Sequence, residues 1–119
     1  MPKRKPDQAQ EQTAPKKQIL YTSQAAQFLD ALPDEVHEEF VAKFQTLARN
    51  GYLEFPAARS LNRGLFEVRV AMTGNAYRVF YCYDTGTVVW ALSGFVKKTQ
   101  QTPIREIAKA LKIKRSIGL

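Results

Sequence analysis

The chain has 119 residues, with 18 Lys and Arg against 11 Asp and Glu, and its net charge of +7 suits a single small basic domain. One cysteine, Cys82, and one histidine, His37, exclude a disulfide framework, a zinc site of several thiolates and two-histidine metal sites. No apolar run approaches the roughly 20 residues of a membrane span, and no apolar stretch follows the basic N-terminus, so we expect a cytoplasmic protein.

Residues 1–17 predict a disordered basic tail. They hold five basic and two acidic residues, three prolines and no aromatic side chain. Such a segment buries too little apolar surface to offset the entropy of ordering. Residues 18–119 are then the folded domain. Its last part, residues 95–119, holds seven basic residues and one acidic residue, a charge that suits a polyanion, although basic ends that only aid solubility explain it as well.

A short strand and two helices open the domain. Gln18–Tyr21 predicts the strand, Ser23 is expected to cap a helix over residues 24–31, and Pro33 opens a second helix that Asn50-Gly51 ends. Apolar side chains recur at spacings of four, four and three in the second helix. They define one buried face: Val36, Phe40, Phe44 and Leu47.

Three strands follow, over Leu65–Met72, Tyr77–Tyr83 and Val88–Ser93. Short turns rich in Gly, Asn and Asp join them, so the three strands form an antiparallel meander. In the first strand, apolar residues alternate with Glu67 and Arg69, which therefore share the opposite face.

A basic helix ends the chain, with Thr102 as its cap and Pro103 in its first turn. The order of elements predicts an α+β fold: an antiparallel sheet of about four strands, two N-terminal helices on one face, and the basic C-terminal helix. The two N-terminal helices can cover only one face of the sheet, and the uncovered face carries Arg69. Whether Arg78 shares that face depends on the register of the strands.

Cations and aromatic rings are the candidate functional residues. Arg69 and Arg78 lie on adjacent strands, and Lys97-Lys98-Thr99 follows the third strand in a predicted loop. Guanidinium groups bind phosphate through paired N–H donors, and the rings of Tyr77 and Tyr83 are candidates for stacking on bases. This combination is typical of single-stranded RNA recognition.

The same residues suffice for RNA cleavage without a metal or other cofactor. The 2′-hydroxyl attacks the adjacent phosphorus, cations stabilise the developing charge, and a lysine or tyrosine with a shifted pKa moves a proton. Structural alternatives stay open: Arg69 only pairs with Glu67 or with a carboxylate of a helix, the tyrosines belong to the core, and the lysines lie in a solvated loop. A basic RNA-binding or ribosome-docking module without catalysis fits the composition as well.

Three segments resemble the RelE/HigB toxins of bacterial toxin–antitoxin pairs, and their phage-derived HigB-like branch matches best. They are Gly64-Leu65-Phe66-Glu67-Val68-Arg69, Tyr77-Arg78-Val79-Phe80-Tyr81, and Gly94-Phe95-Val96-Lys97-Lys98-Thr99-Gln100-Gln101-Thr102-Pro103. The last segment is the most specific. The similarity runs over residues 18–113, nearly the whole folded part.

The resemblance implies the RelE/ParE fold and a toxin that cleaves messenger RNA on the ribosome. It also implies a cognate helix-turn-helix antitoxin, with contact to DNA only through the complex of the two proteins. By position, Arg69 and Arg78 would hold the scissile phosphate, and Lys97 and Lys98 would add positive charge or transfer a proton. Ser93 stands where related toxins often have a histidine, which excludes a histidine base there.

Further RNA contacts are expected from Thr99 of the loop and from Lys109 and Lys112 of the last helix, the two lysines by docking on ribosomal RNA. A ParE-like toxin is the runner-up, because it shares the fold but blocks DNA gyrase and needs no nuclease site. The arginines on the sheet and the Lys-Lys-Thr loop favour the nuclease.

Overall fold

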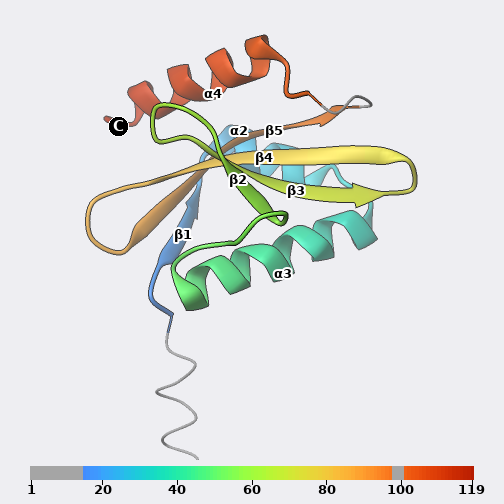
Figure 1. Ribbon diagram of the computed structural model, residues 1–119, viewed down its shortest axis with the longest axis horizontal. Coiled ribbons are helices and arrows are strands. Elements are labelled where there is room, and N and C mark those ends of the chain that lie inside the picture. Colours follow the sequence, from blue (N-terminus) through green and yellow to red (C-terminus); the bar gives the residue numbers. More distant parts are fainter. Residues whose placement is uncertain (1–14, 98–100) are drawn as a thin grey trace, which may run out of the picture.

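The computed structural model describes residues 15–97 and 101–119 (Figure 1). In chain order, its elements are β1 (Gln18–Tyr21), α2 (Ser23–Asp30), α3 (Asp34–Asn50), β2 (Ala58–Ser60), β3 (Phe66–Met72), β4 (Asn75–Tyr83), β5 (Val88–Lys97) and α4 (Ile104–Ser116). The predicted α+β class is confirmed. Within the described ranges, no helix is long and apolar enough to cross a membrane.

One mixed sheet of five strands organises the described domain, in the order β1-β5-β4-β3-β2. Strands β3, β4 and β5 form the predicted antiparallel meander, and β1 pairs with β5 in parallel. The predicted count of about four strands missed β2. This strand has three residues, too few for an alternating pattern to be recognised in the sequence.

Strand β5 runs further than predicted. It ends at Lys97 rather than at Ser93, because its last residues continue the ladder with β4, where Lys97 stands opposite Ala76. The prediction of a loop at Lys97 is therefore wrong. A strand residue has a side-chain direction that the ladder determines, whereas a loop residue does not.

Thr22, rather than the predicted Ser23, caps α2. The Thr22 hydroxyl accepts a hydrogen bond from the Ala25 backbone N–H at 3.1 Å and donates to the Leu92 carbonyl at 2.6 Å. Ser23 is the first residue of the helix and is exposed. The cap thus also joins α2 to β5, a contact between residues distant in the sequence.

The other two helices begin after prolines. Pro33, predicted as the first residue of its helix, is instead the residue just before α3, and Gly51 ends α3 as predicted, in the left-handed conformation at a φ of 89°. Pro103 precedes α4, whose predicted cap Thr102 makes no capping hydrogen bond. The Thr102 hydroxyl donates instead to the side chain of Glu67 in the sheet.

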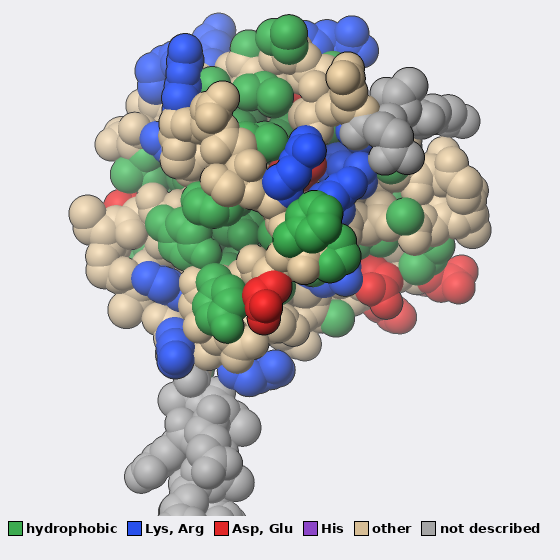
Figure 2. Space-filling view, viewed as in Figure 1, with side chains coloured by type: hydrophobic (Ala, Val, Ile, Leu, Met, Phe, Trp, Pro, Cys, Tyr) green, Lys and Arg blue, Asp and Glu red, His purple; other side chains and the backbone are tan. Residues whose placement is uncertain are grey.

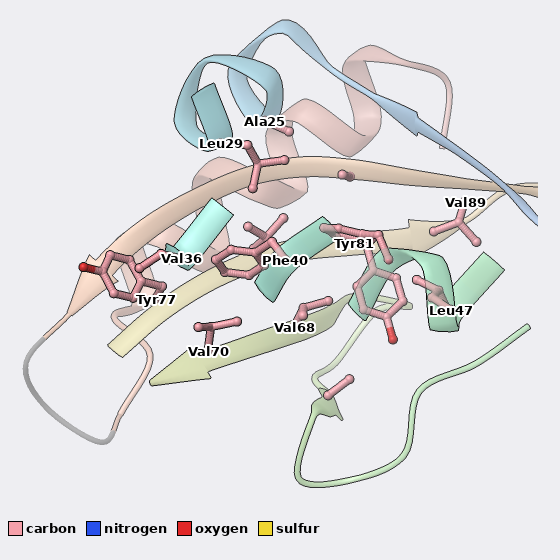
Figure 3. Close-up of a cluster of buried hydrophobic side chains, with 14 residues drawn as sticks. Ala25, Leu29, Val36, Phe40, Leu47, Val68, Val70, Tyr77, Tyr81 and Val89 are labelled. Carbon is pink, nitrogen blue, oxygen red and sulfur yellow. The ribbon is translucent and has the colours of Figure 1, made fainter. Parts of the chain in front are cut away.

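Different helices cover the two faces of the sheet, α3 on one side and α4 on the other (Figure 1). Helices α2 and α3 bury their apolar sides against the larger core cluster, which includes the inward side chains of β3, β4 and β5 (Figure 3). Helix α4 covers a smaller cluster on the other face: Leu65, Phe80, Cys82, Leu92, Phe95, Ala110 and Ile113.

The boundary of the predicted tail is partly visible. Residues 1–14 lie outside the described residues. Lys16 and Lys17, which the sequence assigned to the tail, donate their backbone N–H groups to the Ala48 carbonyl at 2.8 and 2.9 Å. The hydrogen-bonded chain therefore begins before Gln18, where the sequence places the start of the domain.

Candidate functional site

Strand register gathers basic residues on the face of the sheet that α4 partly covers. Arg69 of β3 stands directly opposite Arg78 of β4, and Arg59 of β2 stands opposite Glu67 of β3. Residues opposite each other across a ladder point to the same face, and so do residues two apart on one strand. All four side chains therefore share one face, which answers the question of register that the sequence left open for Arg78.

Lys97 joins this group from the end of β5. Phe95 stands opposite Arg78, and Lys97 follows two residues later, so its side chain leaves the sheet on the same face. Arg69, Arg78 and Lys97 line a groove of about 610 Å³, together with Pro56 and the β3–β4 turn. Figure 2 shows Lys and Arg side chains gathered beside hydrophobic ones near the middle of this view.

The cations differ in their exposure to solvent. Arg78 and Lys97 are 4% and 5% exposed, so they form the floor of the groove. Arg69 is partly exposed and Arg59 is exposed. The Arg69 guanidinium lies 5.8 Å from the centre of the Phe55 ring, within the range of a cation–π contact. The groove thus has a buried cationic floor, and the partly exposed Arg69 that also lines it contacts the ring of Phe55.

A buried carboxylate accompanies the cations. Glu67 is 1% exposed, and its Oε1 lies 3.6 Å from Arg59 Nη2 and 3.6 Å from Arg78 Nε. Its Oε2 accepts a hydrogen bond from the Thr102 hydroxyl. The sequence allowed an ion pair between Arg69 and Glu67. In the structure Glu67 pairs with Arg59 and Arg78 instead.

Burial and neighbouring positive charges lower the pKa of both buried cations. Burial is the largest cause of the lowered pKa of Lys97, Arg78 adds to it, and Glu67 acts in the opposite direction. The pKa of Arg78 is also lowered, mainly by burial, while Glu67 raises it. A guanidinium keeps its charge in proteins nonetheless. Lys97 therefore loses its proton at a lower pH than an ordinary lysine, whereas Arg78 stays positively charged.

The tyrosines predicted to stack on bases lie on the opposite face of the sheet. Tyr77 is buried in the larger core cluster on the α3 side (Figure 3). Tyr83 packs against the same cluster, and its hydroxyl donates to the Gly51 carbonyl at 3.0 Å. The reason is the alternation along β4, which directs Tyr77 and Arg78 to opposite faces. Both tyrosines therefore pack in the core, which was the alternative to base stacking in the sequence analysis.

The remaining predicted residues are separate from the groove or outside the described ranges. Lys109 and Lys112 are exposed on α4. Lys98 and Thr99 lie outside the described residues. Ser93 is 2% exposed within β5, and its hydroxyl has no hydrogen-bond partner in the described part of the chain. The structure therefore brings together three of the predicted residues, Arg69, Arg78 and Lys97.

Two residues of the site were missed by sequence reasoning. Arg59 was not considered because β2 is too short to be recognised. Glu67 was assigned to the correct face, but its burial and its pairing with Arg78 depend on neighbours across the ladder. The spacing of Glu67 and Arg69 in the strand was the available signal for a charged cluster here.

Two comparisons with known proteins found a match. The family described as phage-derived protein Gp49-like matches residues 27–115. The structure of the Escherichia coli toxin RelE, a double arginine-to-alanine mutant in the free state, matches with a TM-score of 0.56 and 18% identity, covering 85% of this chain and 96% of that chain. This likeness identifies the fold. No curated protein matches the chain.

Proposed function

From the premise that the chain belongs to the Gp49-like family of phage-derived proteins and has the fold of RelE, we propose that it is the toxin of a toxin–antitoxin pair. Its activity is cleavage of messenger RNA on the ribosome. The observation that carries this proposal is the groove lined by Arg69, Arg78 and Lys97. The groove suits a phosphate group, because its charged lining is cationic and partly desolvated.

The chemistry requires only the RNA and these side chains. The 2′-oxygen forms a bond to the adjacent phosphorus while the bond to the 5′-oxygen breaks, which leaves a 2′,3′-cyclic phosphate and a 5′-hydroxyl. Arg69 and Arg78 stabilise the negative charge that grows on the phosphoryl oxygens. Lys97, whose pKa is lowered, accepts the 2′-hydroxyl proton in its neutral form, and the departing 5′-oxygen takes a proton from water to give the 5′-hydroxyl.

The partners belong to the same proposal. The family resemblance makes a helix-turn-helix antitoxin the expected inhibitor. Lys109 and Lys112, which are exposed on α4, are the proposed contacts to ribosomal RNA. The groove and α4 lie on the same side of the sheet, so docking through α4 would present the groove to the messenger RNA.

Expression of Arg69→Ala beside the wild type in bacteria, with mapping of messenger RNA ends, tests the proposal. Arg69 is preferred over Arg78 because Arg78 pairs with buried Glu67, so its removal also disturbs the fold. Wild type should arrest growth and produce new 5′-hydroxyl ends in translated messages, and Arg69→Ala should produce neither.

Arg49→Ala is the matched control, because Arg49 is exposed in the last turn of α3, across the sheet from the groove. It should act like the wild type. Growth arrest without new ends would contradict the nuclease and indicate another target, such as gyrase. If the wild-type protein accumulates in soluble form without arresting growth, the assignment as a toxin is contradicted.

A further inference from the structure

Glu67 is an acidic residue in a site otherwise made of cations. At 1% exposure it is buried as completely as the apolar core. A buried carboxylate is strongly destabilising unless it is paired and hydrogen-bonded. Both of its oxygens are engaged: one faces Arg59 and Arg78, and the other accepts the Thr102 hydroxyl.

These contacts join three segments of the chain at one carboxylate. Arg59 comes from β2, at the edge of the sheet, and Arg78 from β4. Thr102 comes from the segment that leads into α4, which starts two residues later. Helix α4 otherwise packs over a separate apolar cluster. Glu67 therefore connects the start of α4 to the floor of the groove.

The direction of Arg78 depends on this carboxylate. Its Nε faces Glu67 Oε1 at 3.6 Å, and its Nη1 donates to the Tyr77 carbonyl at 3.2 Å. Nε is buried and has no hydrogen-bond partner in the described part of the chain, so an ion pair with Glu67 and a hydrogen bond from Nη1 orient the planar group while the residue lines the groove. Arg59, Arg69 and Lys97 would otherwise repel Arg78 in this desolvated space.

We propose that Glu67 is a positioning residue, which holds the Arg78 guanidinium in the orientation that binds the scissile phosphate and makes that orientation depend on the docking of α4 through Thr102. This inference rests on the proposed function, because the reaction is the one assigned to the groove. It goes beyond that function because it gives a role to Glu67, a negative charge beside a groove that is proposed to bind an anion.

Glu67→Gln separates positioning from simple charge. The variant is close in shape but removes one negative charge, so Coulomb attraction alone would make a phosphate bind more tightly. Loss of positioning has the opposite effect. We expect affinity for a single-stranded RNA with one 2′-deoxy residue at the scissile position to fall about tenfold, because the Arg78 guanidinium loses the ion pair that orients it. The single-turnover cleavage rate on saturated ribosomes should fall by about 10- to 100-fold.

Thr102 provides a second and gentler variant, because it is partly exposed and keeps the Glu67 charge in place. Thr102→Ala should lower the cleavage rate about three- to tenfold, the size of one hydrogen bond, and Thr102→Ser should restore it. Glu39→Gln is the matched charge control, since Glu39 pairs with Lys43 on α3. It should leave affinity and cleavage rate unchanged.

A rise in the RNA affinity of Glu67→Gln, or an unchanged cleavage rate, would overturn the positioning role. Equal losses in Thr102→Ala and Thr102→Ser would overturn the link to α4. Failure of the proposed function is a different result: the wild type would bind the RNA but not cleave it on ribosomes. In that case the RNA affinity of Glu67→Gln, measured against the wild type, still tests the positioning role. The RNA affinities of Thr102→Ala and Thr102→Ser test the link to α4. If Glu67→Gln does not fold, the two Thr102 variants decide alone.

Discussion

At the scale of the residue, the groove is held in an electrostatic balance that favours an anion. Arg78 and Lys97 are buried positive charges, and Glu67 is the buried carboxylate that opposes them. Arg59 and Arg69 add further positive charge from the neighbouring strands. Burial and mutual repulsion raise the free energy of these positive charges, and a bound phosphate would offset this cost with its negative charge. This is the physical basis for proposing RNA as the ligand.

The lowered pKa of Lys97 leads to a prediction about pH. Burial and Arg78 hold this pKa below its ordinary value of 10.5, although Glu67 opposes the shift. The neutral amine that accepts the 2′-hydroxyl proton is therefore populated at a lower pH than in an exposed lysine. The single-turnover cleavage rate should rise with pH through the lowered pKa and level off before pH 10.5.

Lys97→Arg tests this assignment, because arginine keeps the positive charge but does not lose its proton. Its cleavage rate should be lower and should lack the rising limb over the same pH range. The measurement is the rate against pH for both proteins, corrected for uncatalysed hydrolysis of the RNA. An identical rising limb in the variant would exclude Lys97 as the proton acceptor.

At the scale of the element, the ends of the helices carry contacts that join distant parts of the chain. The Thr22 hydroxyl caps α2 and also bonds to the Leu92 carbonyl of β5. The Thr102 hydroxyl, just before α4, bonds to Glu67 of β3. Strand β5 behaves similarly, because its last residues bring Lys97 to the groove through the ladder with β4. Helix ends and strand ends thus position the site.

Thr22→Ala should lower the free energy of unfolding by about 1–2 kcal/mol, because it removes a helix cap and a buried hydrogen bond. Ser23→Ala should change it by less than about 0.5 kcal/mol, since Ser23 is exposed and, among the described residues, its hydroxyl donates to the neighbouring Gln24 side chain alone, at 3.3 Å. Urea denaturation of both variants measures the difference. Equal effects would mean that Ser23 acts as the cap in solution.

At the scale of the whole molecule, the chain separates its packing face from its cationic face. Helices α2 and α3 close one face of the sheet, and α4 covers part of the other (Figure 1). The groove is the part of that second face beside α4, and Lys and Arg side chains also lie along the upper edge of the molecule, where α4 runs (Figure 2). This arrangement places a basic helix and a cationic groove side by side, which supports the proposed binding to one large polyanion.

Reversing the charge of Lys109 and Lys112 to Glu should weaken co-sedimentation with ribosomes and make it less sensitive to salt. Both side chains are exposed, so the fold should tolerate the change. Lys16→Glu with Lys43→Glu alters the net charge by the same amount on the opposite side and should have a smaller effect. Equal weakening by both pairs would show a nonspecific charge effect rather than docking through α4.

The sequence by itself determined much of the local structure. The spacing of apolar residues placed α3, the prolines marked where α3 and α4 begin, and the turn residues placed the meander. These features depend on neighbours within a few positions in the chain, which is why a pattern can predict them. The family resemblance also rested on short segments, and the match over residues 27–115 confirms the phage-derived family.

Only the tertiary structure decided which of these residues form a site. Tyr77 and Arg78 are adjacent in the sequence, yet the ladder directs the first into the core and the second into the groove. In the sequence, Glu67 is an ordinary polar residue of an alternating strand. In the structure, residues of β2, β4 and the segment before α4 surround its carboxylate. Register and burial are set by contacts between distant segments, and a one-residue slip would reverse every assignment of face.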